Sequence, residues 1–185
     1  MPFVNPRTVH DPATGLSPPA AWGDAVNDSM QWLAGDNSFS QAKPYCRVYH
    51  AAPQNVANAT ATALSFAAER YDIGGMHSTS TNTSRITVPS GAAGVYSIGA
   101  NVAYASNATG YRLTEIRVNG STRIALTTIP GMSLDNLVVN LSCDYYLSVG
   151  DYVETFATQT SGGILAVVSG SAYSPEMWAR WVAAG

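Results

Sequence analysis

Regular alternation of apolar and polar residues dominates the chain after about residue 45, and it predicts β-strands. In Val95–Ala105 every second residue from Tyr96 to Tyr104 is apolar, and small or polar residues fill most of the positions between them. Residues two apart lie on the same face of a strand, so this segment predicts a half-buried strand. A separate segment, Leu137–Val149, shows the cleanest alternation, with an apolar residue at every odd-numbered position. Each segment therefore has one face for a core and one face for its outside.

Turn residues separate these segments. Asn119–Gly120 supplies two residues that tolerate positive φ, which predicts a tight hairpin, and Gly150–Asp151 predicts another reversal. The predicted strands are 45–50, 62–66, 85–88, 95–105, 111–118, 123–128, 137–149, 152–158, 164–169 and a last one near 172–182. Many short strands joined by turns are typical of an antiparallel two-sheet sandwich or a barrel, so we predict an all-β fold.

The first part of the chain predicts a different element. Ser17 can cap a helix, Pro18 suits its first turn, and Gly35 ends it, which gives a short α-helix over about 18–34. One face of that helix would carry an apolar stripe of Trp22, Val26, Met30 and Leu33. A single helix needs a partner for such a stripe, either its own domain or another protein. We interpret residues 1–40 as an extended arm with this helix, and 41–185 as the β domain.

Composition narrows the possible functions. Charged residues make up 11% of the chain, the formal net charge is −3, and Lys43 is the single lysine. Without a basic stripe to neutralise phosphates, a nucleic-acid partner is not expected. The start of the chain has no basic and apolar leader, and its aliphatic runs are too short to cross a bilayer, so we expect neither export nor a membrane. Synthesis in a cytoplasm is the matching expectation.

Residues that could carry chemistry are scattered. His10, His50 and His77 are far apart and form no metal-ligand or catalytic motif, and His77 is interpreted as a solvated loop residue. Cys46 and Cys143 favour two buried reduced thiols, with a disulfide as the alternative. Acidic residues near two turns could ligate calcium only with help from many further oxygens. The sequence therefore predicts no enzyme, no cofactor and no metal centre.

Several ordered motifs resemble one family, the globular head of complement first-component subunits, which shares the tumour necrosis factor jelly roll. The similar segments are Thr62–Phe66, Arg85–Tyr96, Ile116–Gly120 and Leu147–Val153, and together they span roughly residues 45 to 182. The resemblance implies an antiparallel two-sheet jelly-roll sandwich. It also implies a compact homotrimer with aromatic side chains along the threefold axis. The candidates for that interface are Tyr104, Tyr146, Phe156 and Trp178.

A second resemblance concerns the arm. Its turn-rich segment and helix start are similar to the amino-terminal segments of bacteriophage structural proteins, through Thr8, Asp11, Pro12, Gly15, Pro19, Trp22, Val26 and Asn27. The implied function is a virion structural protein made in the host bacterial cytoplasm. Its trimeric knob would stand on the particle surface as a capsid decoration protein or head fibre, with residues 1–40 bound to a major capsid or tail protein. The alternative is a tail-tip knob that binds a host-surface glycan, for which the polar loop Ser78–Ser84 is the candidate.

Overall fold

The computed structural model describes residues 43–133, 135–170 and 173–185, and this part of the chain is built from strands and loops. It forms one compact unit from Lys43 onward. The strands are β1 (Tyr45–Tyr49), β2 (Gln54–Val56), β3 (Thr62–Ala63), β4 (Ala68–Ile73), β5 (Arg85–Thr87), β6 (Gly94–Tyr104), β7 (Asn107–Val118), β8 (Thr122–Met132), β9 (Leu137–Leu147), β10 (Tyr152–Gln159), β11 (Leu165–Val167) and β12 (Glu176–Ala183).

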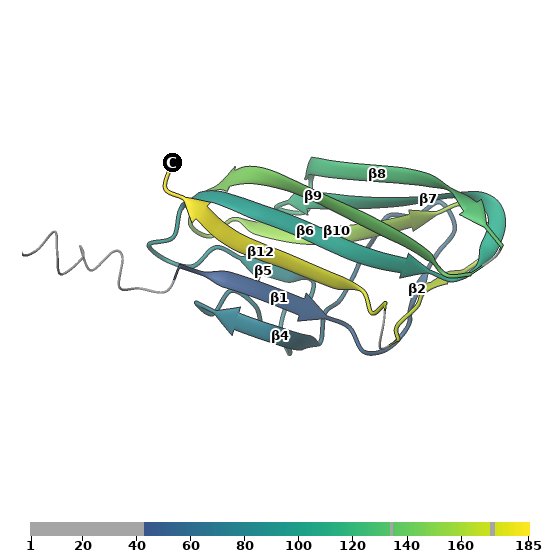
Figure 1. Cartoon of the computed structure of the whole chain (residues 1–185), viewed down its shortest axis with the longest axis horizontal. Helices are drawn as coiled ribbons and strands as arrows, with labels where there is room; N and C mark the ends of the chain where they lie inside the picture. Colours follow the sequence, from purple (N-terminus) through teal and green to yellow (C-terminus); the bar gives the residue numbers. More distant parts are fainter. Residues whose placement is uncertain (1–42, 134, 171–172) are drawn as a thin grey trace, which may run out of the picture. The chain divides into compact units, whose positions relative to one another are not determined.

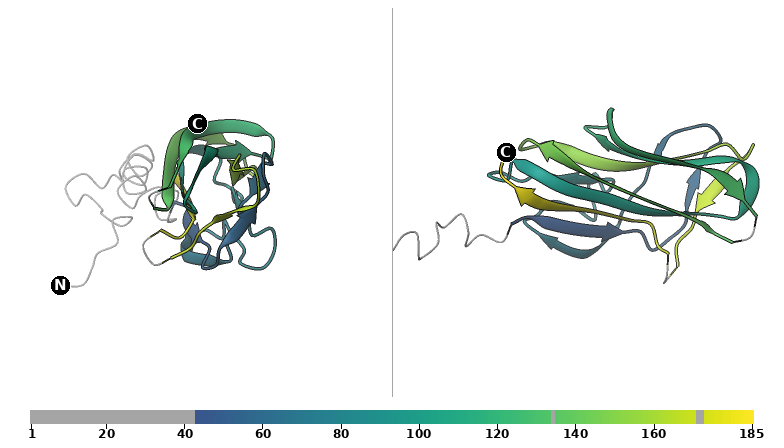
Figure 2. Two further views of the ribbon diagram at one scale, coloured as in Figure 1. Left: turned by 90° about the vertical axis from the view of Figure 1, so that its right-hand side faces the viewer. Right: turned by 45° about the horizontal axis from the view of Figure 1, so that its top comes forward.

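These strands form two antiparallel sheets that pack face to face (Figures 1 and 2). The seven-stranded sheet has the order β2-β11-β6-β12-β1-β4, with β9 paired to β6. The five-stranded sheet has the order β3-β10-β7-β8, with β5 paired to β10. The prediction of an all-β two-sheet jelly roll is confirmed for the described residues. The predicted helix, its stripe and the arm boundary at residue 40 lie outside them.

The core lies between the sheets and is filled by the apolar positions of the alternating strands. On β6 the buried side chains are Tyr96, Ile98, Ala100, Val102 and Tyr104, and β9 adds Val139, Leu141 and Leu147. Burying a large apolar side chain contributes roughly 1.5–3 kcal/mol, so these two strands supply much of the stability of the fold. β6 and β9 pair along their whole length, from Gly94 opposite Leu147 to Tyr104 opposite Leu137.

Two turns are tied together at one end of the sandwich. Asn119 and Gly120 both have positive φ, 52° and 73°, and join β7 to β8 as predicted. The Asn119 amide donates to the Asp151 carboxylate at 2.8 Å and accepts from the Tyr152 backbone N–H at 3.0 Å. The Asn119–Gly120 hairpin and the turn at Gly150 therefore support each other.

The chain enters and leaves the described unit at that same end. β1 and β12 are antiparallel neighbours, with Tyr45 opposite Arg180, so the start of β1 lies beside the end of β12 (Figure 1). The Lys43 ammonium lies 4.3 Å from the centre of the Trp181 ring. This cation–π contact holds the residues before β1 against the end of β12. β10 (Tyr152–Gln159) starts beside that end, where the Tyr152 N–H donates to Asn119, so the loop after β10 lies at the opposite end.

Two strands were not predicted. β2 has only three residues, too few to show a period. β4 lies at the edge of its sheet, and none of its side chains is fully buried. Its segment Ala68–Ile73 therefore lacks the alternation of a half-buried strand.

The cysteines are both free, which agrees with the interpretation as reduced thiols. Cys46 is buried on β1, and burial raises the pKa of its thiol, with the nearby Asp72 and Glu69 charges acting in the same direction. Cys143 on β9 is only half-buried. Burial raises its pKa too, helped by the charge of Asp144.

Candidate functional site

The outer face of the seven-stranded sheet carries aromatic side chains that have no second layer over them within the described unit. Alternation along β12 turns Met177 and Ala179 into the core and leaves Trp178 and Arg180 on the outside. Strand register places Trp178 beside Arg47 of β1 on one side and Gly99 of β6 on the other. Four neighbouring strands thus present one continuous surface.

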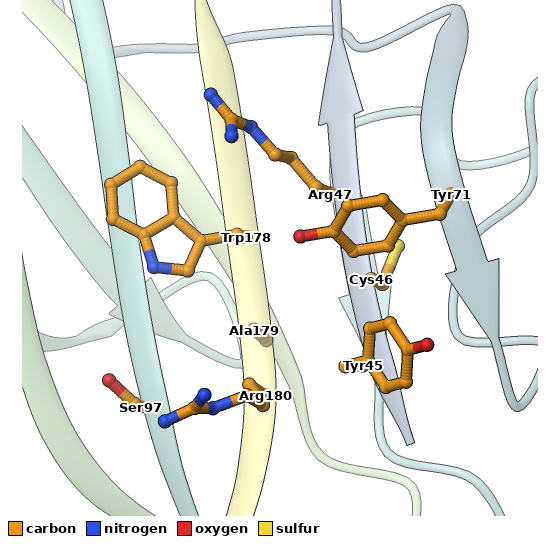
Figure 3. A pocket seen from close by; sticks show the side chains of 8 residues that line it. All are labelled: Tyr45, Cys46, Arg47, Tyr71, Ser97, Trp178, Ala179 and Arg180. Atoms are coloured by element: carbon orange, nitrogen blue, oxygen red, sulfur yellow. The ribbon is translucent and has the colours of Figure 1, made fainter. Parts of the chain in front are cut away.

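A pocket of about 360 Å³ opens on this surface (Figure 3). We call it the sheet-face pocket. It is lined by Tyr45, Cys46, Arg47, Tyr71, Ser97, Trp178, Ala179 and Arg180, from β1, β4, β6 and β12. The Tyr45 and Tyr71 rings meet edge to face with centres 5.3 Å apart, and both side chains are exposed. The lining is thus aromatic with a cationic rim, a composition suited to contact with another protein surface.

A glycine lets the Trp178 ring lie close to the sheet. A Cβ atom on Gly99 would come within 2.1 Å of the Trp178 ring, which is closer than real atoms approach. Figure 3 shows the ring extended sideways from β12 over β6. Gly99 therefore sets the position of the tryptophan, and with it the shape of one wall of the pocket.

Beside the pocket, a nearly buried carboxylate holds three strands together. Glu176 of β12, whose side chain is 8% exposed, forms ion pairs with Arg47 of β1 and Arg70 of β4. The hydrogen bond to Glu176 raises the pKa of Arg70, and the Arg70 guanidinium also covers the Tyr49 ring at 4.2 Å. This triad fixes Arg47 at the rim of the pocket.

At one edge of the sandwich β8 ends one sheet and β9 ends the other. These two strands lie side by side, and the exposed residues there are Leu126, Val138, Tyr145 and Tyr146. We call this the β8/β9 edge. Val138 lies near one end of β9 and the two tyrosines lie near the other, where Tyr145 and Tyr146 point to opposite faces of the strand.

The structure separates the four predicted interface residues. Trp178 lies in the sheet-face pocket, and Tyr146 lies on the β8/β9 edge with half its surface exposed. Phe156 is on the five-stranded sheet, half-buried under the Arg117 guanidinium at 4.2 Å. Tyr104 is fully buried, and its hydroxyl donates to the Leu113 carbonyl at 2.8 Å. It leaves no surface for another copy, so we exclude it from the interface.

Sequence reasoning missed most of the pocket lining. Tyr71 lies on the unpredicted strand β4, and Arg47 and Arg180 carry no motif. The alternation of 176–181 does contain a signal, because it assigns Trp178 and Arg180 to one face of the last strand. Their partners depend on pairing with strands more than 70 residues earlier in the chain, which no local pattern shows.

The side chain of His77 is buried and hydrogen-bonded within the loop that follows β4. The interpretation of His77 as a solvated residue is wrong, because its side chain is 0% exposed. Its Nδ1 lies 2.9 Å from the Glu69 carboxylate and its Nε2 lies 3.2 Å from the Thr83 carbonyl oxygen. His77 thus closes the loop that follows β4. Among the described residues, no group of three His, Cys, Asp or Glu side chains could hold a metal ion.

Comparisons with known proteins agree with this topology. No family model and no curated protein matches the sequence. Among solved structures, the vertex protein P5 of PRD1 is 19% identical with a TM-score of 0.57, over 76% of this chain and 98% of that one. The globular domain of zebrafish complement 1qA protein gives 14% and 0.54, over 77% and 100%. Eiger TNF from S. frugiperda gives 12% and 0.56, over 78% and 96%.

At these identities the likeness concerns the fold. No helix within the described ranges is long and apolar enough to cross a membrane. The described part of the chain is a jelly roll of the type shared by the complement 1q globular domain and the tumour necrosis factor proteins.

Proposed function

We propose that this protein is a bacteriophage virion structural protein, a trimeric jelly-roll knob on the particle surface that acts as a capsid decoration protein or head fibre. The observation that carries the proposal is the fold shared with the vertex protein P5 of PRD1 over 98% of that chain. The resemblance of the first 40 residues to phage attachment segments supports it. In this proposal residues 1–40, with Trp22, Val26, Met30 and Leu33, bind a major capsid or tail protein.

Two surfaces of the same protomer support the homotrimer, because one is an open aromatic pocket and the other carries exposed apolar side chains that could fill it. The sheet-face pocket is aromatic and open, and the β8/β9 edge presents Leu126, Tyr145 and Tyr146. A contact between two different patches is head-to-tail, and such contacts close into a ring when the rotation between copies allows it. In the proposed ring, the edge of each copy enters the pocket of the next copy, and Trp178 and Tyr146 are interface residues.

The mass of the full chain in solution tests the trimer. One chain has a mass of 19.4 kDa, and light scattering should give about three times that value. A mass near that of one chain would contradict the proposal.

Attachment to the particle is tested separately. A chain without residues 1–40 should remain soluble and trimeric but should not join virions that otherwise incorporate the full-length protein. If the shortened chain still joins the virion, the attachment surface lies on the knob. If it aggregates, the helix belongs to the fold of the knob.

The second candidate is a tail-tip or receptor-binding knob that binds a host-surface glycan. It is favoured by the loop 78–82, where Thr79, Ser80, Thr81 and Asn82 are exposed while the buried side chain of His77 holds the base of the loop. A glycan array probed with the full-length trimer tests this role. Binding that is lost when Thr79, Ser80 and Thr81 are changed to alanine would support it, and no binding at high protein concentration would count against it.

A further inference from the structure

Two opposite charges on the outer face of the seven-stranded sheet have no partner within the described residues. Arg180 of β12 and Asp144 of β9 are both exposed, and neither forms an ion pair or a side-chain hydrogen bond in the described unit. The other described arginines are engaged. Those at 47, 70, 85, 117 and 123 pair with glutamates, and Arg112 is held by backbone carbonyl oxygens.

Strand register places the two charges in one row. Ser97 of β6 is opposite Arg180 on one side and opposite Asp144 on the other. Neighbouring strands lie about 4.8 Å apart, so the two Cα atoms are about 10 Å apart with only a serine side chain between them. In Figure 3 the Arg180 side chain extends from β12 toward Ser97. On the other side of Arg180 in this row lies the exposed Tyr45 of β1, so it is the side toward Asp144, with only Ser97 between, that is low.

We infer that Arg180 of one copy forms an ion pair with Asp144 of the next copy, and that three such pairs set the register of the trimer. This inference rests on the proposed homotrimer and names residues that determine its geometry. Arg180 is on the rim of the sheet-face pocket, and Asp144 lies on β9 two residues from Tyr146, on the edge that enters the neighbour's pocket. Insertion of that edge carries Asp144 toward Arg180. Complementary charges of this kind select one docking register over others.

Charge reversal tests the pair in the full-length protein. R180D and D144R should each raise the concentration at which half of the trimer dissociates by about tenfold or more, because like charges then face each other. The double variant R180D/D144R should return to within about threefold of the wild type, since an opposite pair is restored. Analytical ultracentrifugation gives these concentrations, and circular dichroism checks that each variant is folded.

The chain offers a matched control. Asp135 is exposed and precedes β9, and at about 3.4 Å per residue it lies roughly 30 Å along the strand from Asp144. D135R makes the same charge change and should leave the trimer as stable as in the wild type. If D135R weakens the trimer as much as D144R does, net charge explains the effect and the specific pair is refuted.

Mixing the single variants separates a pair between copies from a pair within one copy. In a ring made from both R180D and D144R chains, two of the three contacts place opposite charges together, so mixed trimers should form and be visible by native mass spectrometry. If the pair formed within one copy, mixing would not restore the trimer, so the absence of mixed trimers would refute the inference.

If the wild type is a trimer and none of these variants raises its dissociation concentration, the ion pair is refuted but the proposed trimer stands. A wild-type monomer would refute the proposed trimer as well.

Discussion

Among single residues, Glu115 shows how this lysine-poor protein uses its arginines. The carboxylate lies on β7 with a side chain 3% exposed, and it accepts hydrogen bonds from Arg117 and Arg123 at 2.8 Å. Burial alone would raise its pKa, but the hydrogen bonds from Arg123 and Arg117 and their charges outweigh burial and lower it. A carboxylate with a lowered pKa stabilises the fold above its ordinary titration range and loses that contribution as the pH falls through its folded pKa.

We predict that Glu115→Gln lowers the free energy of unfolding by about 1–2 kcal/mol at neutral pH. That is less than the loss for a fully buried pair, because Arg123 is 50% exposed. The difference from the wild type should shrink toward zero as the pH falls below the lowered folded pKa of Glu115, because the wild-type carboxylate is then protonated as well. Urea unfolding at several pH values measures it. Asp135→Asn, at an exposed carboxylate, should show little change, and a pH-independent effect of Glu115→Gln would contradict the ion-pair explanation.

Gly99 gives a second prediction at this scale. Gly99→Ala places a methyl group where the Trp178 ring lies, so the ring must move, at a cost of about 1–2 kcal/mol. Tryptophan fluorescence and the melting temperature report the change, and the trimer should weaken with the pocket. Gly163→Ala is the control, because its new Cβ meets nothing within 4 Å. Unchanged fluorescence and stability in Gly99→Ala would show that Trp178 does not depend on this glycine.

At the scale of elements, the predicted strands were those whose two faces differ. β6 and β9 each have one face in the core, so their alternation is visible in the sequence. β4 is an edge strand whose charged side chains bind Glu176 of β12 and the loop around His77 instead of entering the core, so its sequence looks like a loop. Tyr104 illustrates the opposite error. Its place on the apolar face of β6 already marked it as a core residue, and a polar hydroxyl does not prevent burial when it is hydrogen-bonded.

The β7–β8 hairpin yields a prediction that separates two causes of stability. Asn119→Gly tolerates the positive φ but removes the hydrogen bonds to Asp151 and Tyr152. Asn119→Ala removes the same hydrogen bonds and is also strained by the positive φ. We expect a loss of about 1 kcal/mol for glycine and about 2 kcal/mol for alanine. Thermal unfolding measures both. Equal losses would show that backbone strain plays no part at this turn.

At the scale of the whole molecule, the sequence predicted the fold better than the site. Order and spacing of local motifs were enough for a jelly roll, because each strand carries its own pattern. The sheet-face pocket instead requires Tyr45, Ser97 and Trp178 to meet across three strands, and their meeting is decided by register. Local alternation in the sequence cannot show a surface that is assembled from such distant strands.

The common end for entry and exit of the described unit makes the opposite end suitable for displaying foreign peptides. Gly162 and Gly163 follow the far end of β10, which starts beside the Asn119 turn and runs to Gln159, and a Cβ atom on either glycine would meet nothing within 4 Å. A peptide epitope inserted between them should leave the melting temperature within a few degrees of the wild type and should be bound by its antibody on the purified protein; under the proposed attachment through residues 1–40 it should also be bound on intact particles. The same epitope fused after Gly185, beside Tyr146, should be poorly accessible there. An inserted peptide would then point away from the end at which the chain enters and leaves the β domain.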